Sequence, residues 1–345
     1  MKDFFKLLEK GRFSEAKELA EKQEFPENIF YKGIIFYNMG NLEKAEKLLE
    51  NYINLKSDNS EAYYYLGNIY LEKNILDKAE KFLKKAVKLK SEAKYFNDLG
   101  FVYYKKGKYE KSIEFYDKAL EIDSYLSITF YNKGLSLRKL GRYEEAIGQY
   151  NKAIVLNPEE PDYYYNLGIV YRLSGKPEKA IQIYKKAIKL KPDFYKAWNN
   201  LGNVYYDLGK YEKAIECYKK SVEIAPDYHL AWENLANTYL DIDEYDKAVK
   251  TFKKAIKLSP DCANCYMDMG IALKELGKYE EALKAYEKAE KINPELKALA
   301  LYNKACLFAS KGEKEKTVDY LNKAFKLDPS LKEYAKTDPD LKGIL

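Results

Sequence analysis

Apolar residues in this chain follow two alternating helical patterns that recur about every 34 residues. The copy that begins at Pro161 shows the first pattern at Tyr164, Leu167, Gly168 and Tyr171. These residues lie one, three or four positions apart, which predicts a helix with one buried face. We refer to it as the first helix of each copy.

A second apolar pattern follows the first within each copy. One copy shows it at Ala146, Tyr150 and Ala153, and another shows it at Ala248, Phe252 and Ala255. A large residue flanked by two small ones allows two antiparallel helices to approach closely. Each copy is therefore predicted to form a helical hairpin, whose second member we call the second helix.

A glycine or alanine marks the same point of the first helix in every copy. If this residue takes position 8, the series is Gly33, Gly67, Gly100, Gly134, Gly168, Gly202, Ala236, Gly270 and Ala305. Successive members are 33 to 35 residues apart. A period in the thirties predicts a stack of small units, because no single unit can bury its apolar face alone.

Position 15 is predicted to end the first helix in a left-handed conformation. It is glycine in seven copies, at Gly40, Gly107, Gly141, Gly175, Gly209, Gly277 and Gly312. The two exceptions are Asn74 and Asp243, and asparagine and aspartate tolerate this conformation better than other residues with a side chain. The turn is therefore expected in all nine copies.

These positions resemble the tetratricopeptide repeat family. One copy matches the family pattern at Trp198, Leu201, Gly202, Tyr205, Ala214, Tyr218 and Pro226. The resemblance covers essentially the whole chain and implies an all-α fold, a right-handed superhelical solenoid of antiparallel helix pairs. We expect nine repeats over residues 26–329, with starts at 26, 60, 93, 127, 161, 195, 229, 263 and 298. Residues 1–25 are expected to form a degenerate N-terminal capping hairpin, and residues 330–345 a C-terminal capping helix.

The charge of the chain is mixed. It has 60 Lys and Arg residues and 54 Asp and Glu residues, which is a net charge of +6 and not the balance of a nucleic-acid-binding protein. Lysines are denser on the second helices, at Lys185, Lys186, Lys189, Lys250, Lys253, Lys254 and Lys257. We interpret them as a solvated outer face, with RNA binding as the alternative. No apolar run is long enough to cross a bilayer, so we expect a cytoplasmic protein without membrane insertion.

The residues needed for catalysis are scarce. His229 is the only histidine, and no glycine-rich phosphate loop is present. We therefore expect no enzymatic activity, no cofactor and no small-molecule substrate.

The cysteines include one pair with the spacing of a zinc or redox site, Cys262 and Cys265. His229 lies one repeat earlier, and Cys217 and Cys306 belong to other copies. We therefore expect the cysteines to pack as small residues, with no metal site and, in a reducing compartment, no disulfide.

A groove is the expected place of function. The resemblance implies that positions 2, 5, 6, 9, 12 and 13 of each first helix face a bound partner, and these positions form one stripe of a helix. Position 6 carries an amide or a carboxylate at Asp98, Asn132, Asn166, Asn200, Asn234, Asp268 and Asn303, and position 9 adds Asn203 and Asn237. Amides both donate and accept hydrogen bonds, so they can pair with the backbone of an extended peptide. The series resembles the asparagine ladder of protein O-GlcNAc transferases. The alternative is that these amides hydrogen-bond only within the hairpins.

The predicted groove is electrically divided. Positions 12 and 13 carry basic residues in three consecutive repeats, at Lys105, Arg138, Lys139 and Arg172. Position 13 of the next three repeats is acidic, at Asp207, Asp241 and Glu275, although Lys274 interrupts this run at position 12. Charge complementarity orients partners, so we expect an acidic stretch of the ligand near residues 105–172 and a basic stretch near 207–275.

Together these features predict a non-enzymatic scaffold for protein–protein interaction that binds an extended peptide or protein segment in the groove. A self-assembling oligomeric scaffold is the alternative, and an RNA-binding helical repeat is a third hypothesis.

Overall fold

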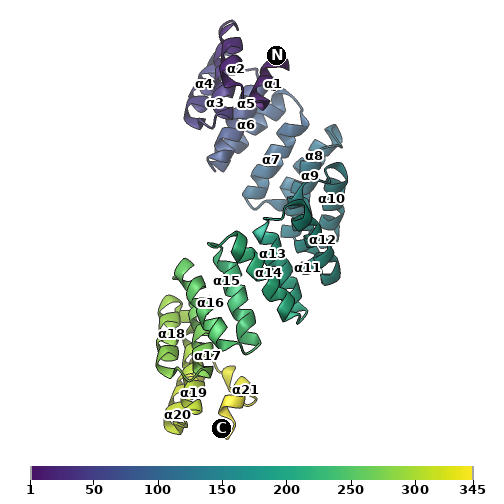
Figure 1. Cartoon of the computed structure of the whole chain (residues 1–345). Coiled ribbons are helices and arrows are strands. Elements are labelled where there is room, and N and C mark those ends of the chain that lie inside the picture. Colours follow the sequence, from purple (N-terminus) through teal and green to yellow (C-terminus); the bar gives the residue numbers. More distant parts are fainter. Residues whose placement is uncertain (1, 344–345) are drawn as a thin grey trace. The chain divides into compact units, whose positions relative to one another are not determined.

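The computed structural model describes residues 2–343, and within this range it contains helices and turns but no strand. The chain divides into two compact units, Met1–Lys176 and Pro177–Leu345, and each is described by itself. Figure 1 shows helices following one another in pairs within each unit.

The first unit contains eleven helices among the described residues. They are α1 (Lys2–Glu9), α2 (Phe13–Glu21), α3 (Glu27–Asn38), α4 (Leu42–Leu55), α5 (Ser60–Glu72), α6 (Leu76–Leu89), α7 (Ala93–Lys105), α8 (Tyr109–Ile122), α9 (Ser127–Lys139), α10 (Tyr143–Leu156) and α11 (Pro161–Leu173).

The second unit begins with α12. Its helices are α12 (Pro177–Leu190), α13 (Tyr195–Asp207), α14 (Tyr211–Ile224), α15 (His229–Asp241), α16 (Tyr245–Leu258), α17 (Ala263–Glu275), α18 (Tyr279–Ile292), α19 (Lys297–Ser310), α20 (Lys314–Leu327) and α21 (Leu331–Ala335). Two short 3₁₀ helices, η1 (Pro294–Leu296) and η2 (Pro339–Leu341), complete it.

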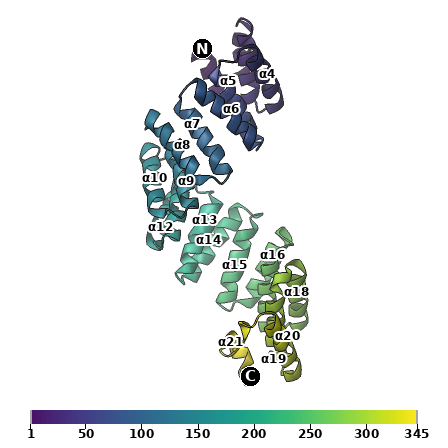
Figure 2. The same ribbon diagram turned by 180° about the vertical axis from the view of Figure 1, so that it is seen from behind.

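Consecutive helices pack as hairpins, such as α7 with α8 in the first unit and α17 with α18 in the second. Each first helix also contacts the first helices of neighbouring repeats, as α5, α7 and α9 do in one unit and α15, α17 and α19 in the other. First helices therefore form one layer of each unit, and Figure 2 gives the view from behind. This arrangement confirms the predicted all-α solenoid of helix pairs.

The small residue at position 8 lies where the two helices of a hairpin touch. A β-carbon built on Gly202 would lie 2.5 Å from Cε1 of Tyr218, and one on Gly270 would lie 2.4 Å from Cε1 of Tyr286. A β-carbon at Gly202 or Gly270 would therefore require the tyrosine ring or one of the two helices to shift. The same close contact with the second helix occurs at Gly33, Gly67, Gly100 and Gly134.

The turn at position 15 has the predicted conformation. Asn74 and Asp243 have φ values of 57° and 60°, and the glycines at this position lie between 66° and 75°. Because glycine has no β-carbon, this conformation costs it little.

The two ends of the chain differ in form. At the N-terminal end, α1 and α2 pack together, and the ring of Phe4 lies 4.7 Å from that of Tyr31. At the other end, α21 has only five residues, because the following Asp338–Pro339 step favours an extended backbone and starts η2. The predicted C-terminal capping segment is thus a short helix and a 3₁₀ turn; residues 1 and 344–345 of the predicted caps lie outside the described residues.

Helix length also bears on membranes. Among residues 2–343, no helix combines the length and the apolar character that a bilayer crossing requires.

Candidate peptide-binding groove

Groove positions of the last two repeats line a hollow of about 540 Å³. Helix α17 contributes Met267, Asp268, Ile271, Lys274 and Glu275, and α19 contributes Leu299, Tyr302, Asn303 and Cys306. The other wall is formed by Leu331, Tyr334, Asp338, Pro339 and Asp340. We call the segment of residues 331–343 the tail. The tail thus lies against the layer of first helices, and Figures 1 and 2 show it in yellow beside α19.

Two carboxylates of the tail bind three groove side chains. The hydroxyl group of Tyr302, at position 5, donates to Oδ2 of Asp338 at 2.6 Å, and the thiol of Cys306, at position 9, donates to the same oxygen at 3.6 Å. Lys274, at position 12, forms an ion pair with Asp340. Three side chains of α17 and α19 thus contact two tail carboxylates that are separated by one residue.

Burial strengthens these contacts. Lys274 is only 8% exposed; burial would lower its pKa, but hydrogen bonds to Asp340 and Glu275 outweigh this effect and the pKa lies above its ordinary value. Burial, followed by the hydrogen bond to Asp338, raises the pKa of Tyr302, and burial raises the pKa of Cys306. Both groups therefore keep the protons that they donate to Asp338.

The predicted amide ladder is engaged within the protein in the first unit. Asn132 is 8% exposed and donates to Oδ1 of Asn97 at 3.3 Å, and Asn166 is 6% exposed and donates to Tyr131 at 3.0 Å. Asp98 accepts hydrogen bonds from Asn97 at 2.9 Å and Asn68 at 3.1 Å, while burial raises its pKa. These side chains join neighbouring first helices.

In the second unit, the ladder forms a chain of amides. Asn203 donates to Asn200 at 3.3 Å and accepts from Asn234 at 3.1 Å and from the hydroxyl group of Tyr218 at 2.8 Å. Asn237 is half-buried, and its Oδ1 atom has no hydrogen-bond partner within the described chain. The amides therefore serve the packing of the layer, and their use by a ligand stays a prediction.

The last two predicted ladder residues line the hollow beside the tail. Burial, with contributions from Glu233 and Asp241, raises the pKa of Asp268 to about 7. Asn303 donates to the sulfur of Met267 at 3.2 Å.

The predicted charged residues of the groove differ in exposure. In the first unit, Lys105 and Lys139 are exposed, whereas Arg138 and Arg172 are half-buried. In the second unit, Asp207 is exposed, Asp241 accepts a hydrogen bond from Tyr206, and Glu275 pairs with Lys274 at 2.7 Å. Orientation of a ligand by these charges stays a prediction.

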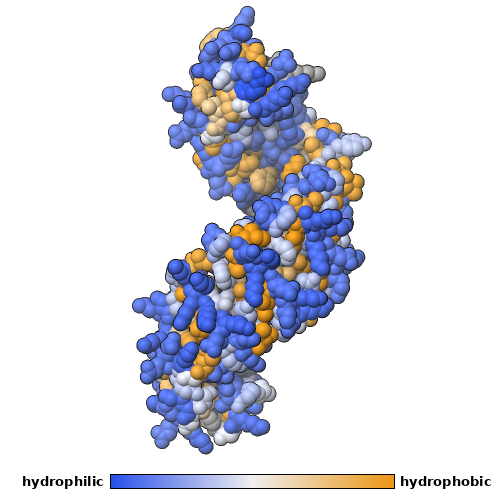
Figure 3. Space-filling model, in the orientation of Figure 1, coloured by the Kyte–Doolittle hydropathy of each residue, from blue (hydrophilic) through white to orange (hydrophobic). Residues whose placement is uncertain are grey.

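The lysines of the second helices are exposed to solvent. Lys185, Lys186, Lys253 and Lys254 are exposed. Figure 3 shows a surface that is largely hydrophilic in this view and is interrupted by apolar patches.

The cysteine pair corrects one expectation. Cys262 and Cys265 form a disulfide rather than packing as separate small residues. The N-cap of α17 is Cys262, whose sulfur accepts a hydrogen bond from the backbone N–H of Cys265 at 3.2 Å. This first turn holds the two Cα atoms 5.3 Å apart, within the range of disulfides. Cys217 and Cys306 are free and buried.

Sequence reasoning missed the residues that hold the tail. Position 5 is tyrosine in three other copies as well, so Tyr302 did not stand out; position 9 is cysteine only at Cys306, and Asp338 and Asp340 lie outside the repeat. The one available signal was Lys274, a cation that interrupts an acidic run.

Comparison with known families identifies the class of the protein. Profiles described as tetratricopeptide repeat or TPR repeat match residues 32–94, 91–154, 134–175, 170–209, 195–228, 227–295 and 267–331. The matches extend together from residue 32 to residue 331, so the chain belongs to the tetratricopeptide repeat family. Repeats of this family generally bind proteins. A search of curated proteins gave no match.

Two solved structures support the fold, and a third is reported for its sequence identity alone. The C-terminal part of a TPR repeat-containing protein from Cytophaga hutchinsonii is 21% identical, with a TM-score of 0.56, and the alignment covers 70% of this chain and 99% of that one. PilF of Pseudomonas aeruginosa is 21% identical with a TM-score of 0.52, covering 62% and 96%. MamA is 29% identical with a TM-score of 0.45, covering 49% and 98%.

Proposed function

We propose that this protein is a non-enzymatic cytoplasmic scaffold that binds an extended segment of a partner protein in the groove of its first helices. The observation that supports this function best is the tail itself. Side chains at groove positions 5, 9 and 12 already bind a segment that is not part of any repeat, through Tyr302, Cys306 and Lys274.

The contacts of the tail indicate the chemistry of the partner at this end of the groove. Two carboxylates separated by one residue meet a phenol, a thiol and an ammonium group, and Leu341 is buried beside them. A partner segment with acidic residues at this spacing, followed by an apolar residue, would make the same contacts. The tail would then compete with the partner and act as a regulator of the groove.

Site-specific cross-linking tests the proposal. A photoreactive amino acid replaces Leu299, a groove residue 39% exposed, in a chain whose tail carries Asp338→Asn and Asp340→Asn. We expect it to cross-link a protein in an extract of the source organism, and an excess of tail peptide should prevent this. The matched control places the same probe at Val318 of α20, which is 43% exposed and lies in a second helix. Equal cross-linking from both positions, or none from Leu299, contradicts the proposal.

Self-association is the second candidate function, and the tail also supports it. A tail that binds a groove in the same chain can bind the groove of another copy, which would link chains together. Light scattering tests this directly. Molar mass should rise with protein concentration for the native chain and stay that of a monomer for the Asp338→Asn, Asp340→Asn chain; a constant molar mass for the native chain excludes exchange of tails.

A further inference from the structure

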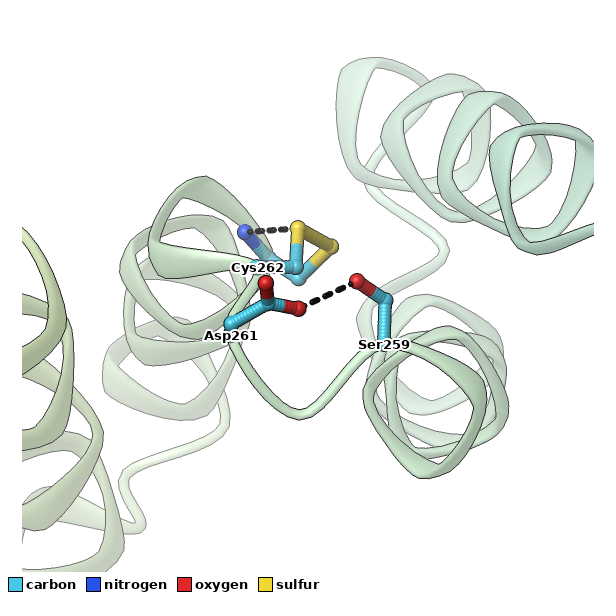
Figure 4. The surroundings of a disulfide bond; sticks show 4 residues. Ser259, Asp261 and Cys262 are labelled. Atoms are coloured by element: carbon cyan, nitrogen blue, oxygen red, sulfur yellow. Dashed lines mark hydrogen bonds between the residues drawn. A yellow bond between two sulfur atoms is a disulfide. The ribbon is translucent and has the colours of Figure 1, made fainter.

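The disulfide of the second unit lies beside a carboxylate of the preceding repeat, that of Glu233. Helices α15 and α17 contact each other. The sulfur atoms of Cys262 and Cys265 and a carboxylate oxygen of Glu233 all lie within 4.8 Å of one another. Figure 4 shows the disulfide at the start of the helix that follows the Ser259–Asp261 turn. Residues one repeat apart in sequence are therefore close in space.

His229 lies near this cluster, although its ring nitrogens are not among the atoms that lie within 4.8 Å of one another. It begins α15 and precedes Glu233 by four residues, so the two side chains lie on one face of that helix. Positive charge on His229 contributes a lowering effect to the pKa of Glu233, on the same helix, and to the pKa of Asp261, which directly precedes Cys262. The imidazole thus shares one face of α15 with the carboxylate that lies beside the cysteines.

We propose that the reduced form of this protein binds one Zn²⁺ ion through Cys262, Cys265 and Glu233, with His229 as the fourth ligand. The donor set is two thiolates, one carboxylate and one imidazole, which are the ligands of four-coordinate zinc sites. Binding of Mg²⁺ or Ca²⁺ to this donor set is disfavoured, because these ions prefer oxygen ligands to thiolates. Two ligands come from one turn of α17 in a C-x-x-C arrangement, and two come from successive turns of α15.

The local structure favours thiolates once the disulfide is reduced. Reduction by a dithiol adds two electrons and two protons to the bond between Cys262 and Cys265, and the reductant becomes a disulfide. Binding of Zn²⁺ then releases the two thiol protons to solvent. The positive end of the α17 dipole and the N–H of Cys265 stabilise negative charge on the sulfur of Cys262.

The ion would join two adjacent repeats. Cys265 is 1% exposed, while Cys262 and Glu233 are half-buried, so the cluster is sheltered yet open to solvent on one side. Glu233 is also position 5 of its first helix, a groove position. Oxidation would replace a metal bridge between α15 and α17 with a bond confined to α17, so the redox state would alter the coupling of the two repeats.

Titration of the full chain with Co²⁺ tests the proposal, because Co²⁺ replaces Zn²⁺ and its thiolate complexes are coloured. The reduced chain should bind one equivalent with a thiolate charge-transfer band, release it to Zn²⁺, and bind none after oxidation. The Cys262→Ser, Cys265→Ser chain should lose the band. Glu233→Gln and His229→Gln should each weaken binding by about tenfold or more.

Controls keep the test specific. Cys217→Ser removes a buried cysteine of α14 away from the cluster and should bind as the native chain does. Comparison of the oxidised and reduced native chain requires no substitution, and circular dichroism verifies that each variant is folded. Absence of stoichiometric binding by the reduced chain overturns the proposal. Retention of the band without Cys262 and Cys265, or its loss in Cys306→Ser, where Asp338 and Asp340 offer another ligand group, also overturns it.

Discussion

The hydroxyl group of Tyr302 donates a 2.6 Å hydrogen bond to Oδ2 of Asp338, which lies 36 residues later in the sequence. Tyr302 occupies a groove position of α19, whereas Asp338 belongs to the tail. The bond therefore places part of the chain against the groove in which we propose that a partner binds.

Replacing the two tail carboxylates should free the tail. In the Asp338→Asn, Asp340→Asn chain, the groove loses an ion pair and a charge-assisted hydrogen bond, so trypsin should cleave after Lys336 faster than in the native chain. Limited proteolysis followed by mass spectrometry measures the rate. Glu315→Gln is the control, because Glu315 is an exposed acidic residue of the neighbouring helix α20 and not of the tail. Equal cleavage in all three chains would show that the carboxylates do not hold the tail.

Asp268 should make stability depend on pH. Burial raises its pKa from 3.8 to about 7, so between these values the folded chain holds a proton that the unfolded chain has released. Stability then falls as pH rises from about 4 to about 7. Asp268→Asn removes this effect. In urea unfolding, the free energy of unfolding of the variant should therefore rise relative to that of the native chain across that range. As a control, Asp227→Asn replaces an exposed aspartate, and its free energy of unfolding should vary with pH as that of the native chain does. The same pH dependence in Asp268→Asn would contradict the expectation.

Close helix contact at position 8 predicts opposite effects of two glycine-to-alanine changes. Gly202→Ala should destabilise the protein by about 1–3 kcal/mol, because the new β-carbon would overlap the ring of Tyr218. Gly148→Ala, in α10, should stabilise it by about 0.5–1 kcal/mol, since nothing among the described residues lies within 4 Å of the added carbon. Chemical denaturation followed by circular dichroism compares the two. A loss of the same size in both would show that position 8 is not a special contact.

Two donors that serve Asn203 are missing at the unsatisfied oxygen of Asn237: the hydroxyl group of Tyr218, and the amide of Asn234, which Asp268 replaces in the next repeat. In the preceding repeat, Tyr218 donates to Asn203 at 2.8 Å, but Phe252 occupies the position of Tyr218 beside Asn237. Phe252→Tyr should therefore stabilise the protein by about 0.5–1.5 kcal/mol. The gain should disappear when Asn237→Leu is present as well, and the double-mutant cycle measures this difference. A gain that persists without Asn237 would assign the effect to packing alone.

Local sequence patterns predicted the repeats well. The positive φ of Asn74 and Asp243 and the contact of Gly202 with Tyr218 follow from rules that apply to every copy. Such rules describe one hairpin and its neighbours, and the same rules recur nine times.

Contacts made only once could not be predicted in this way. Lys274 meets Asp340 across 66 residues, and no other copy repeats the pair. Glu233 lies in the repeat before Cys262, a sequence distance that suggests separation, although stacking of the repeats brings its carboxylate within 4.8 Å of the cysteine sulfurs. The expectation of no disulfide was wrong because it rested on the compartment and not on the geometry of the first turn of α17.

Binding of the tail peptide in trans tests the central claim most directly. A fluorescent peptide of residues 331–343 is titrated against three proteins. They are the native chain, the tail-released chain with Asp338→Asn and Asp340→Asn, and the tail-released chain that also carries Lys274→Ala. We expect saturable binding of the peptide to the tail-released chain. Binding to the native chain should be weaker, because its own tail competes at high effective concentration. Loss of Lys274 should weaken binding by about tenfold or more, as expected for a hydrogen bond to a charged group. No binding to the tail-released chain, or an affinity that is the same without Lys274, would contradict the claim that the groove binds an extended acidic segment.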